Sequence, residues 1–150
     1  MESVESYLTE LGSASATPGG GSAAMLVAAT GAALLAMVSR IALENKKLTE
    51  RHEAAARIAR HADDLRSRFL GARKTDESAF EAVDAAQKRS KDDPERATAL
   101  ESALKEAADV PLQGAQLVIQ ALELAAQTAR LSSPALISDV GCAVRFLQAA

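Results

Sequence analysis

The chain of 150 residues lacks tryptophan, has one tyrosine and three phenylalanines, and carries only 8 valines and 4 isoleucines against 34 alanines. Strands favour β-branched and aromatic residues, so this composition argues against a sheet-rich fold. A single cysteine, Cys142, excludes a disulfide within the chain and suits a reducing compartment. The cytoplasm is therefore the expected location.

A large excess of one charge is also missing, because 17 basic and 20 acidic residues give a net charge of -3. With no basic tail, the electrostatic footprint of a nucleic-acid-binding protein is lacking, and no nucleic-acid partner is expected. The first residues lack the basic region with which a secretory signal begins, so no such signal is expected. Of the 37 charged residues, 29 lie between Glu44 and Asp109, so both ends of the chain are expected to be buried.

No charged residue lies between Glu10 and Arg40, and the stretch Ala23–Val38 is almost entirely small or apolar. A membrane span requires about 20 strongly apolar residues, whereas this stretch is shorter and mostly alanine. A helix that is apolar on every side is typical of a protein interior. We therefore expect a buried helix from about Ser22 to Glu44 and no membrane partner; a membrane-spanning helix is the alternative.

Apolar residues at steps of three and four predict further helices. The first is short and ends near Gly12. A long helix should run from Thr49 to about Arg89, because its apolar stripe keeps its phase through Gly71. A glycine inside a helix costs about 1 kcal/mol relative to alanine without forbidding the helix, so a break at Gly71 is the alternative.

Three prolines mark the remaining helix boundaries. Asp93–Pro94 and Ser133–Pro134 each place a capping residue before a proline, which is typical of a helix start. Because a proline inside a helix costs about 3 kcal/mol, we expect Pro111 to follow a break at Asp109–Val110. The sequence therefore predicts an all-α helical bundle with a central buried Ala-rich helix, formed by residues 1–150 as a single domain.

The segment Thr17–Ser22 carries the clearest sign of a binding site. Its three glycines, Gly19, Gly20 and Gly21, precede a helix, so bare backbone amides lie at the positive end of the helix dipole. Such a helix start favours a carboxylate or a phosphate. The segment matches neither the dinucleotide motif nor the P-loop. The alternative is a flexible turn that only allows the helix to pack closely.

Two acidic residues are candidates for chemistry. Asp76 lies in the apolar stripe of the long helix, where an unpaired carboxylate is costly. We expect it to face the bundle interior near the glycine turn of its own or a partner subunit, with a cation such as Lys46 as compensation; a stripe that frays at this point is the alternative. Asp139 follows Ser138 in the first turn of the last helix, where an acid also simply stabilises the helix dipole.

A metal site is not expected. His52 and His61 lie nine residues apart without a third ligand at metal-binding spacing. We expect both to be surface residues, and Cys142 to be a small buried thiol on the last helix.

Together, these segments resemble the cyclodeaminase/cyclohydrolase family, which includes the C-terminal domain of formiminotransferase-cyclodeaminase and bacterial methenyltetrahydrofolate cyclohydrolases. The Pro-Gly-Gly-Gly-Ser segment and the Asp-x-x-Ala-Phe pair are the most specific pieces. The matching pieces follow the family order along the whole chain: Thr17–Ser22, Gly31–Leu34, Met37–Val38, Lys46–Lys47, Asp76 with Ala79–Phe80, Val110–Leu112, and Ser138–Asp139 with Gly141.

The resemblance implies an all-α homodimer that acts on one-carbon adducts of tetrahydrofolate. The reaction would be loss of ammonia from the 5-formimino form with closure to the 5,10-methenyl form, or hydrolysis of the methenyl form to 10-formyltetrahydrofolate. A tetrahydrofolate derivative is then the substrate, and no tightly bound cofactor is expected. The implied catalytic residues are Asp76 and Asp139, and the implied substrate-binding residues are Pro18, Gly19, Gly20, Gly21, Ser22, Lys46 and Ser138.

Two features depart from the family pattern. Leu131–Pro134 stands where family members usually have an asparagine shortly before the Ser-Asp pair. Family members also continue past the point where this sequence stops, so the chain is expected to lack the family's C-terminal end. A catalytically incomplete helical dimer that binds folate or another small anion, or a pure interaction module, is therefore the alternative to an enzyme.

Overall fold

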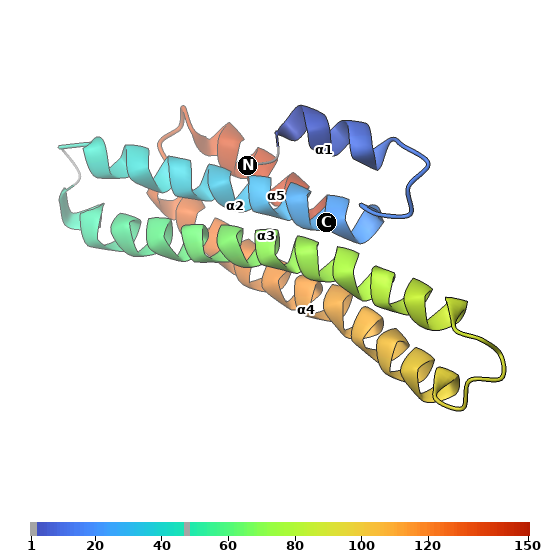
Figure 1. Cartoon of the computed structure of the whole chain (residues 1–150). Helices are drawn as coiled ribbons and strands as arrows, with labels where there is room; N and C mark the ends of the chain where they lie inside the picture. Colours follow the sequence, from blue (N-terminus) through green and yellow to red (C-terminus); the bar gives the residue numbers. More distant parts are fainter. Residues whose placement is uncertain (1–2, 47–48) are drawn as a thin grey trace.

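The fold is a bundle of α-helices, as the composition predicts. In the computed structural model, residues 3–46 and 49–150 are described, and they contain no strand. The long helices α2, α3 and α4 lie side by side, with α5 behind α2 and α1 across the N-terminal half of α2 (Figure 1). The elements in chain order are α1 (Val4–Leu11), α2 (Gly20–Glu44), the 3₁₀ turn η1 (Thr49–Arg51), α3 (His52–Lys88), α4 (Arg96–Leu131) and α5 (Ile137–Ala149).

Helix α2 is the centre of the bundle and packs against α3, α4 and α5. Ala28, Ala32, Leu35 and Val38 are completely buried in the shared core. Small residues allow close approach: a Cβ added to Gly31 would lie 3.1 Å from the backbone oxygen of Ala143 on α5. The predicted central buried helix is confirmed, although α2 begins at Gly20, inside the glycine run, rather than at Ser22.

The length and composition of α2 would also allow it to cross a membrane. Its most apolar window of 18 residues has a mean hydropathy of 1.9, and 44% of that window is buried inside the structure. The core helix of a globular protein passes the same test, and the contacts of α2 with three other helices account for its apolar character.

Helix α3 runs without interruption through Gly71, so the predicted long helix is confirmed and the alternative break is wrong. Ile58, Leu65 and Phe69 on this helix are buried in the core before the glycine, and Ala79 is buried after it. Packing on both sides of Gly71 therefore compensates for its low helix propensity.

Helix α4 also continues through a residue where we expected a break. Pro111 lies inside Arg96–Leu131, so the break predicted at Asp109–Val110 is wrong. The helix is held by buried residues on both sides of the proline, Ala103 and Val110 before it and Leu117 after it. Tertiary packing here outweighs the local cost of a proline. Because proline has no amide hydrogen, the carbonyl group of Ala107 loses its usual partner within the helix.

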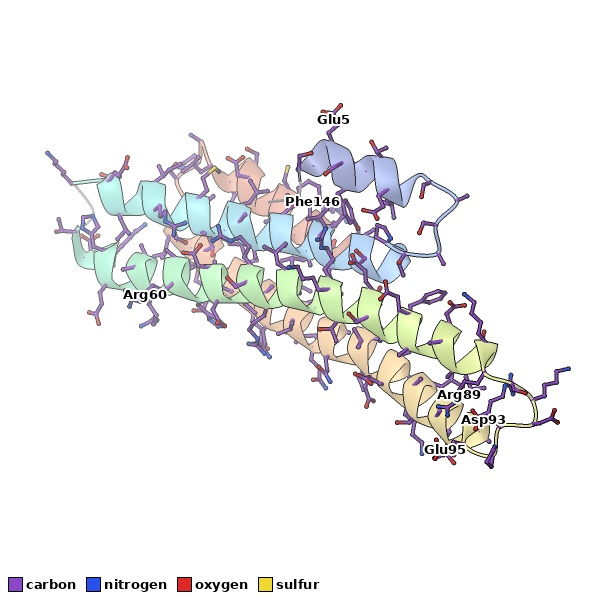
Figure 2. The ribbon with its side chains drawn as sticks, viewed as in Figure 1. Glu5, Arg60, Arg89, Asp93, Glu95 and Phe146 are labelled. Carbon is purple, nitrogen blue, oxygen red and sulfur yellow. The ribbon has the colours of Figure 1, made fainter. Side chains whose placement is uncertain are left out.

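The other two prolines lie in turns that precede the helices rather than in their first turns. Arg89 donates to Asp93 Oδ2 at 2.8 Å, and Asp93 Oδ1 accepts from the backbone nitrogen of Glu95 at 2.9 Å (Figure 2). The Arg89 hydrogen bond, followed by the Glu95 amide, lowers the pKa of Asp93. Asp93 thus stabilises a turn, and α4 begins only at Arg96. Similarly, α5 begins at Ile137 and not at Pro134.

The two ends of the chain are less buried than the charge distribution predicts. The exposed fractions of Val4 and Leu8 on α1 are 71% and 56%, and that of Ile137 on α5 is 50%. Cys142 is exposed, so the prediction of a buried thiol is wrong. Within α1, all of which the structure describes, Tyr7 is the one buried residue.

We predict opposite effects of alanine at two helical glycines. No described atom lies within 4 Å of a Cβ added to Gly71, so Gly71→Ala should raise the free energy of unfolding by up to about 1 kcal/mol. Gly31→Ala must push α5 away and should be less stable than Gly71→Ala by at least about 1 kcal/mol. Urea unfolding of both variants measures this difference, and equal stabilisation would contradict the packing described for α2 and α5.

Candidate functional site

The first turn of α2 lies directly against the carboxyl group of Asp76 on α3. A Cβ placed on Gly21 would lie 2.2 Å from Asp76 Oδ1 and 2.6 Å from Oδ2, far inside contact distance. Only a glycine at position 21 therefore permits this approach. Asp76 is half-buried and lies at the glycine turn of its own chain, as its place in the apolar stripe predicts.

This contact forms one wall of a cavity of about 250 Å³. The connection between α1 and α2 supplies another wall, and one turn of α4 closes the cavity at Ala107. The lining combines bare backbone, one carboxyl group and one aromatic ring. The residues that line it are Ala16, Thr17, Gly19, Gly20, Gly21, Asp76, Ala79, Phe80 and Ala107.

The position of Asp76 bears on which ligand groups could lie at the glycine turn. The backbone amides of a helix start attract an anion, and here the chain's own Asp76 carboxylate lies at the turn. A carboxylate of a ligand at the same place would be repelled by a like charge. A ligand anion at the turn from Gly19 to Gly21 would therefore lie next to the Asp76 carboxyl group.

Ser22, the next residue of α2, faces inward and is fully buried. Its hydroxyl donates to Glu77 Oε1 on α3 at 2.6 Å and is 2.9 Å from the Tyr7 hydroxyl. Arg73 lies over the Tyr7 ring, with its guanidinium carbon 4.7 Å from the ring centre and its Nε 4.0 Å from Glu77 Oε1. The Ser22 hydroxyl is thus occupied within the protein. Pro18 is also buried, so neither side chain lines the cavity.

The other expected site residues lie at the opposite end of α2. Lys46 follows the end of α2 and is exposed, and Ser138 and Asp139 lie in the first turn of α5. The last turns of α2 and the connection before α5 line a separate cavity of about 620 Å³, which includes Val38 and Leu136. At 1.5 Å per residue, Val38 is about 25 Å along the helix from Gly21.

Within one chain, the expected site residues therefore lie in two separate groups. Gly19, Gly20, Gly21 and Asp76 meet at one cavity, whereas Lys46, Ser138 and Asp139 do not reach it. The expectation that Lys46 compensates the charge of Asp76 is wrong within one chain, because the full length of α2 separates them. Lys47, the other half of that basic pair, lies outside the described residues.

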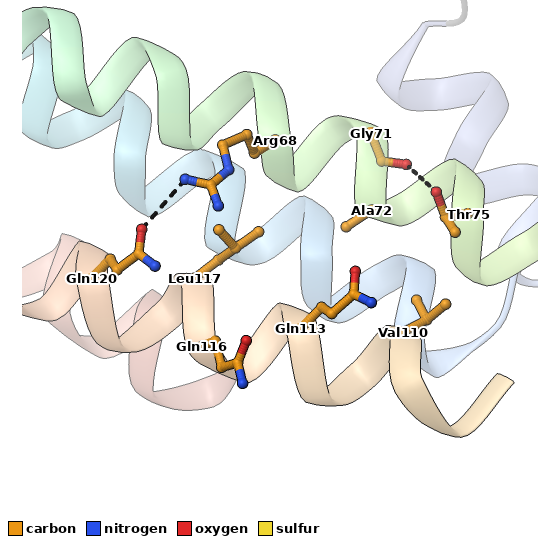
Figure 3. A pocket seen from close by; sticks show the side chains of 9 residues that line it. All are labelled: Arg68, Gly71, Ala72, Thr75, Val110, Gln113, Gln116, Leu117 and Gln120. Atoms are coloured by element: carbon orange, nitrogen blue, oxygen red, sulfur yellow. Dashed lines mark hydrogen bonds between the residues drawn. The ribbon is translucent and has the colours of Figure 1, made fainter. Parts of the chain in front are cut away.

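A third cavity, of about 330 Å³, lies between α3 and α4 and contains none of the expected site residues (Figure 3). Arg68 on α3 donates to Gln120 Oε1 on α4 at 3.3 Å across its rim, and Thr75 bonds the carbonyl of Gly71 within α3. Gln113 and Gln116 complete a polar lining from α4. This groove is separate from Asp76, although Thr75 precedes it in the chain.

Among residues 3–46 and 49–150, no group of three or more histidine, cysteine or acidic side chains is placed to hold a metal ion. His61 is exposed, and His52 Nε2 is 3.0 Å from the carbonyl oxygen of Asn45.

Tyr7, Arg73 and Glu77 are neighbours of the site that sequence reasoning missed. The hydrogen bond between Ser22 and Glu77 joins residues 55 positions apart, and periodicity within a helix carries no signal for such a pair. Only the fact that Tyr7 is the chain's single tyrosine could have drawn attention to it.

Known proteins resemble this chain over nearly its whole length. Methenyltetrahydrofolate cyclohydrolase of Methylorubrum extorquens is 35% identical over 147 residues, which cover 95% of this chain and 71% of that protein. Formimidoyltransferase-cyclodeaminase of Mus musculus is 31% identical over 150 residues, which cover 97% of this chain and 28% of that protein. The chain thus spans less than a third of the mammalian protein.

The fold is also shared with a solved structure. The crystal structure of formiminotetrahydrofolate cyclodeaminase from Thermotoga maritima matches with a TM-score of 0.89 at 27% identity, covering 99% of this chain and 72% of that one. The family model described as formiminotransferase-cyclodeaminase matches residues 3–150. With a match over nearly its whole length, the chain belongs to the formiminotransferase-cyclodeaminase family.

Proposed function

We propose that this protein converts one-carbon adducts of tetrahydrofolate. The reaction is either closure of 5-formiminotetrahydrofolate to the 5,10-methenyl form with release of ammonia, or hydrolysis of the methenyl form to 10-formyltetrahydrofolate. The relatives named for these two activities support the proposal. The observation that carries it is the Asp76 carboxyl group, which lies next to the glycine turn and lines a cavity.

A single carboxyl group can serve both reactions as a general base and acid. In the deamination, N10 attacks the formimino carbon and gives up its proton to Asp76, which returns a proton to the departing ammonia. In the hydrolysis, Asp76 accepts a proton from the water that attacks the methenyl carbon and returns it to N5 as the carbon–N5 bond breaks; the second proton of the water is released to solvent. In both reactions the carbon–nitrogen bond that breaks must lie within hydrogen-bond reach of Asp76.

The size of the cavity sets how the substrate lies. At about 250 Å³ it is smaller than the roughly 300–1,000 Å³ typical of sites that enclose a whole ligand. It therefore takes the reacting end of the folate, with Phe80 as an aromatic wall for a ring. The glutamate end extends outside, away from the negative charge of Asp76.

The separation of Asp76 from Asp139 favours one alternative, a catalytically incomplete protein that binds folate or another small anion. The two carboxyl groups cannot act on one bond within a chain. In this alternative the cavity at Asp76 still binds the ligand, but the bond-breaking step is missing.

We predict that Asp76→Asn removes activity while the protein stays folded. The change keeps the size of the side chain but removes the proton carrier, so kcat should fall by about 10²–10⁴-fold and folate binding should weaken by about tenfold. The melting temperature should change by only a few degrees. Absorbance of methenyltetrahydrofolate in the near ultraviolet and ammonia release from the formimino substrate measure the two activities.

The control is Asp64→Asn on the same helix, because the Asp64 side chain is 61% exposed and far from the cavity. No acceleration of either reaction by the unmodified protein would contradict the enzyme. Calorimetric binding of folate would then support the incomplete protein, and no binding would support a pure interaction module. An Asp76→Asn variant that loses stability but keeps its activity would assign Asp76 a structural role.

We also predict that Gly21→Ala displaces the Asp76 carboxyl group. The new methyl group would overlap Oδ1 and Oδ2, and the short side chain can escape only by turning out of the site. We expect kcat/KM to fall by at least about tenfold, with stability unchanged or slightly raised because alanine favours helix. Gly20→Ala, where no described atom lies within 4 Å, should have a clearly smaller effect.

The protein is further proposed to be a cytoplasmic homodimer. On α2, the central helix of the bundle, the large apolar residues Met37 and Ile41 remain 36% and 41% exposed. A stable interface requires about 1,200–2,000 Å² of buried surface, and an apolar face on the central helix is its natural starting point. Light scattering at micromolar concentration should give twice the chain mass, and Met37→Lys with Ile41→Lys should give a monomer. A monomeric unmodified protein would contradict this proposal.

A further inference from the structure

Helix α1 is held at the cavity end of the bundle by Tyr7, its one buried side chain among the residues Val4–Leu11 that the structure describes. Tyr7 is 2% exposed, and its hydroxyl is 2.9 Å from the hydroxyl of the fully buried Ser22. The guanidinium of Arg73 lies over the ring of Tyr7. An aromatic and cationic contact of this kind adds to the attraction between the helices.

The direction of this hydrogen-bond chain follows from its donors. Ser22 has one hydroxyl proton and donates it to Glu77 Oε1 at 2.6 Å. The Tyr7 hydroxyl must therefore donate to Ser22, and the chain runs from Tyr7 through Ser22 to a carboxylate. A hydroxyl that accepts one hydrogen bond is polarised, and this strengthens the hydrogen bond that it donates.

The hydrogen bond between Ser22 and Glu77 lies one residue further along α2 and α3 than the contact between Gly21 and Asp76. Gly21 and Asp76 are in contact, and Ser22 and Glu77 are the next residues on α2 and α3. The bond between Ser22 and Glu77 therefore fixes the rotation and separation of the two turns that bring Asp76 to the glycine.

We propose that Tyr7 is a positioning residue for Asp76 and acts through Ser22 and Glu77. The same anchor holds the connection from α1 to α2, in which Ala16 and Thr17 line the cavity. The inference rests on the role of Asp76 in the proposed function. It adds α1, which otherwise exposes its apolar residues Val4 and Leu8, to the parts of the chain on which turnover depends.

The first test is a comparison of Tyr7→Phe in two backgrounds. The change removes only the hydroxyl and keeps the ring under Arg73, so kcat should fall by about three- to tenfold with a smaller change in KM. In the Asp76→Asn background, Tyr7→Phe should have no further effect on the residual rate or on folate binding, because its action passes through Asp76. Glu77→Gln, which keeps an acceptor for Ser22, should retain more activity than Glu77→Leu.

The matched control is Thr9→Val, which removes an exposed hydroxyl from the same helix. The Thr9 hydroxyl donates to the carbonyl of Glu5 in its own helix at 2.9 Å. A Tyr7→Phe variant that lowers the melting temperature but leaves kcat and KM unchanged would overturn the inference. An equal loss in both backgrounds would overturn it as well.

A second measurement needs no substrate and separates this inference from the proposed function. Because Tyr7 is the only tyrosine, protein grown with 3-fluorotyrosine gives a single fluorine resonance. Gly21→Ala, which displaces Asp76, should shift this resonance, whereas Gly20→Ala should leave it almost unchanged. If the protein is inactive but the resonance shifts, the proposed function fails and the coupling stands. A resonance that responds equally to both alanines would show that Tyr7 is not coupled to Asp76.

Discussion

The structure depends on the approach of a carboxyl group to a bare helix start. Gly21 has no side chain, so Asp76 can lie where a methyl group would otherwise be. The positive end of the α2 dipole offsets part of the cost of holding this charge half-buried. Ser22 and Glu77, the next residues along the two helices, are hydrogen-bonded at 2.6 Å, and the cavity lies between the connection to α1 and one turn of α4. A side chain at position 21 would overlap the Asp76 carboxyl group and displace it.

Much of the fold could be predicted, because periodicity within one helix is a local property. The uncharged, alanine-rich stretch predicted the central helix α2. The apolar stripe that keeps its phase through Gly71 predicted the continuous helix α3. The inward position of Asp76 follows from the same stripe. These features depend on residues three or four positions apart, where helix geometry alone determines which side chains share a face.

The continuous helix at Pro111 and the hydrogen bonds among Tyr7, Ser22 and Glu77 could not be predicted from local sequence patterns, for different reasons. Pro111 has a known cost inside a helix, but the packing of Val110 and Leu117 that outweighs it comes from other helices. The bond from Ser22 to Glu77 joins two helices that meet only after folding. Ser22 stands out only as the end of the glycine segment, and Glu77 lies in no special motif. Nothing in their spacing indicates that the two residues pair or that Tyr7 joins them.

The position of Asp139 has a sufficient explanation within α5 itself. Residue Leu136, at the N-cap, has no side-chain hydrogen bond to the helix start. An acid in the first turn compensates, because its charge interacts favourably with the exposed amides and the helix dipole. Because Leu136, just before α5, lies at a cavity with the last turns of α2, whereas Asp76 lies at its first turn, Asp139 and Asp76 lie near opposite ends of α2 within one chain. The order of Asp76 and Asp139 in the sequence therefore does not indicate that they share one site. Their positions at opposite ends of α2 separate them within one chain.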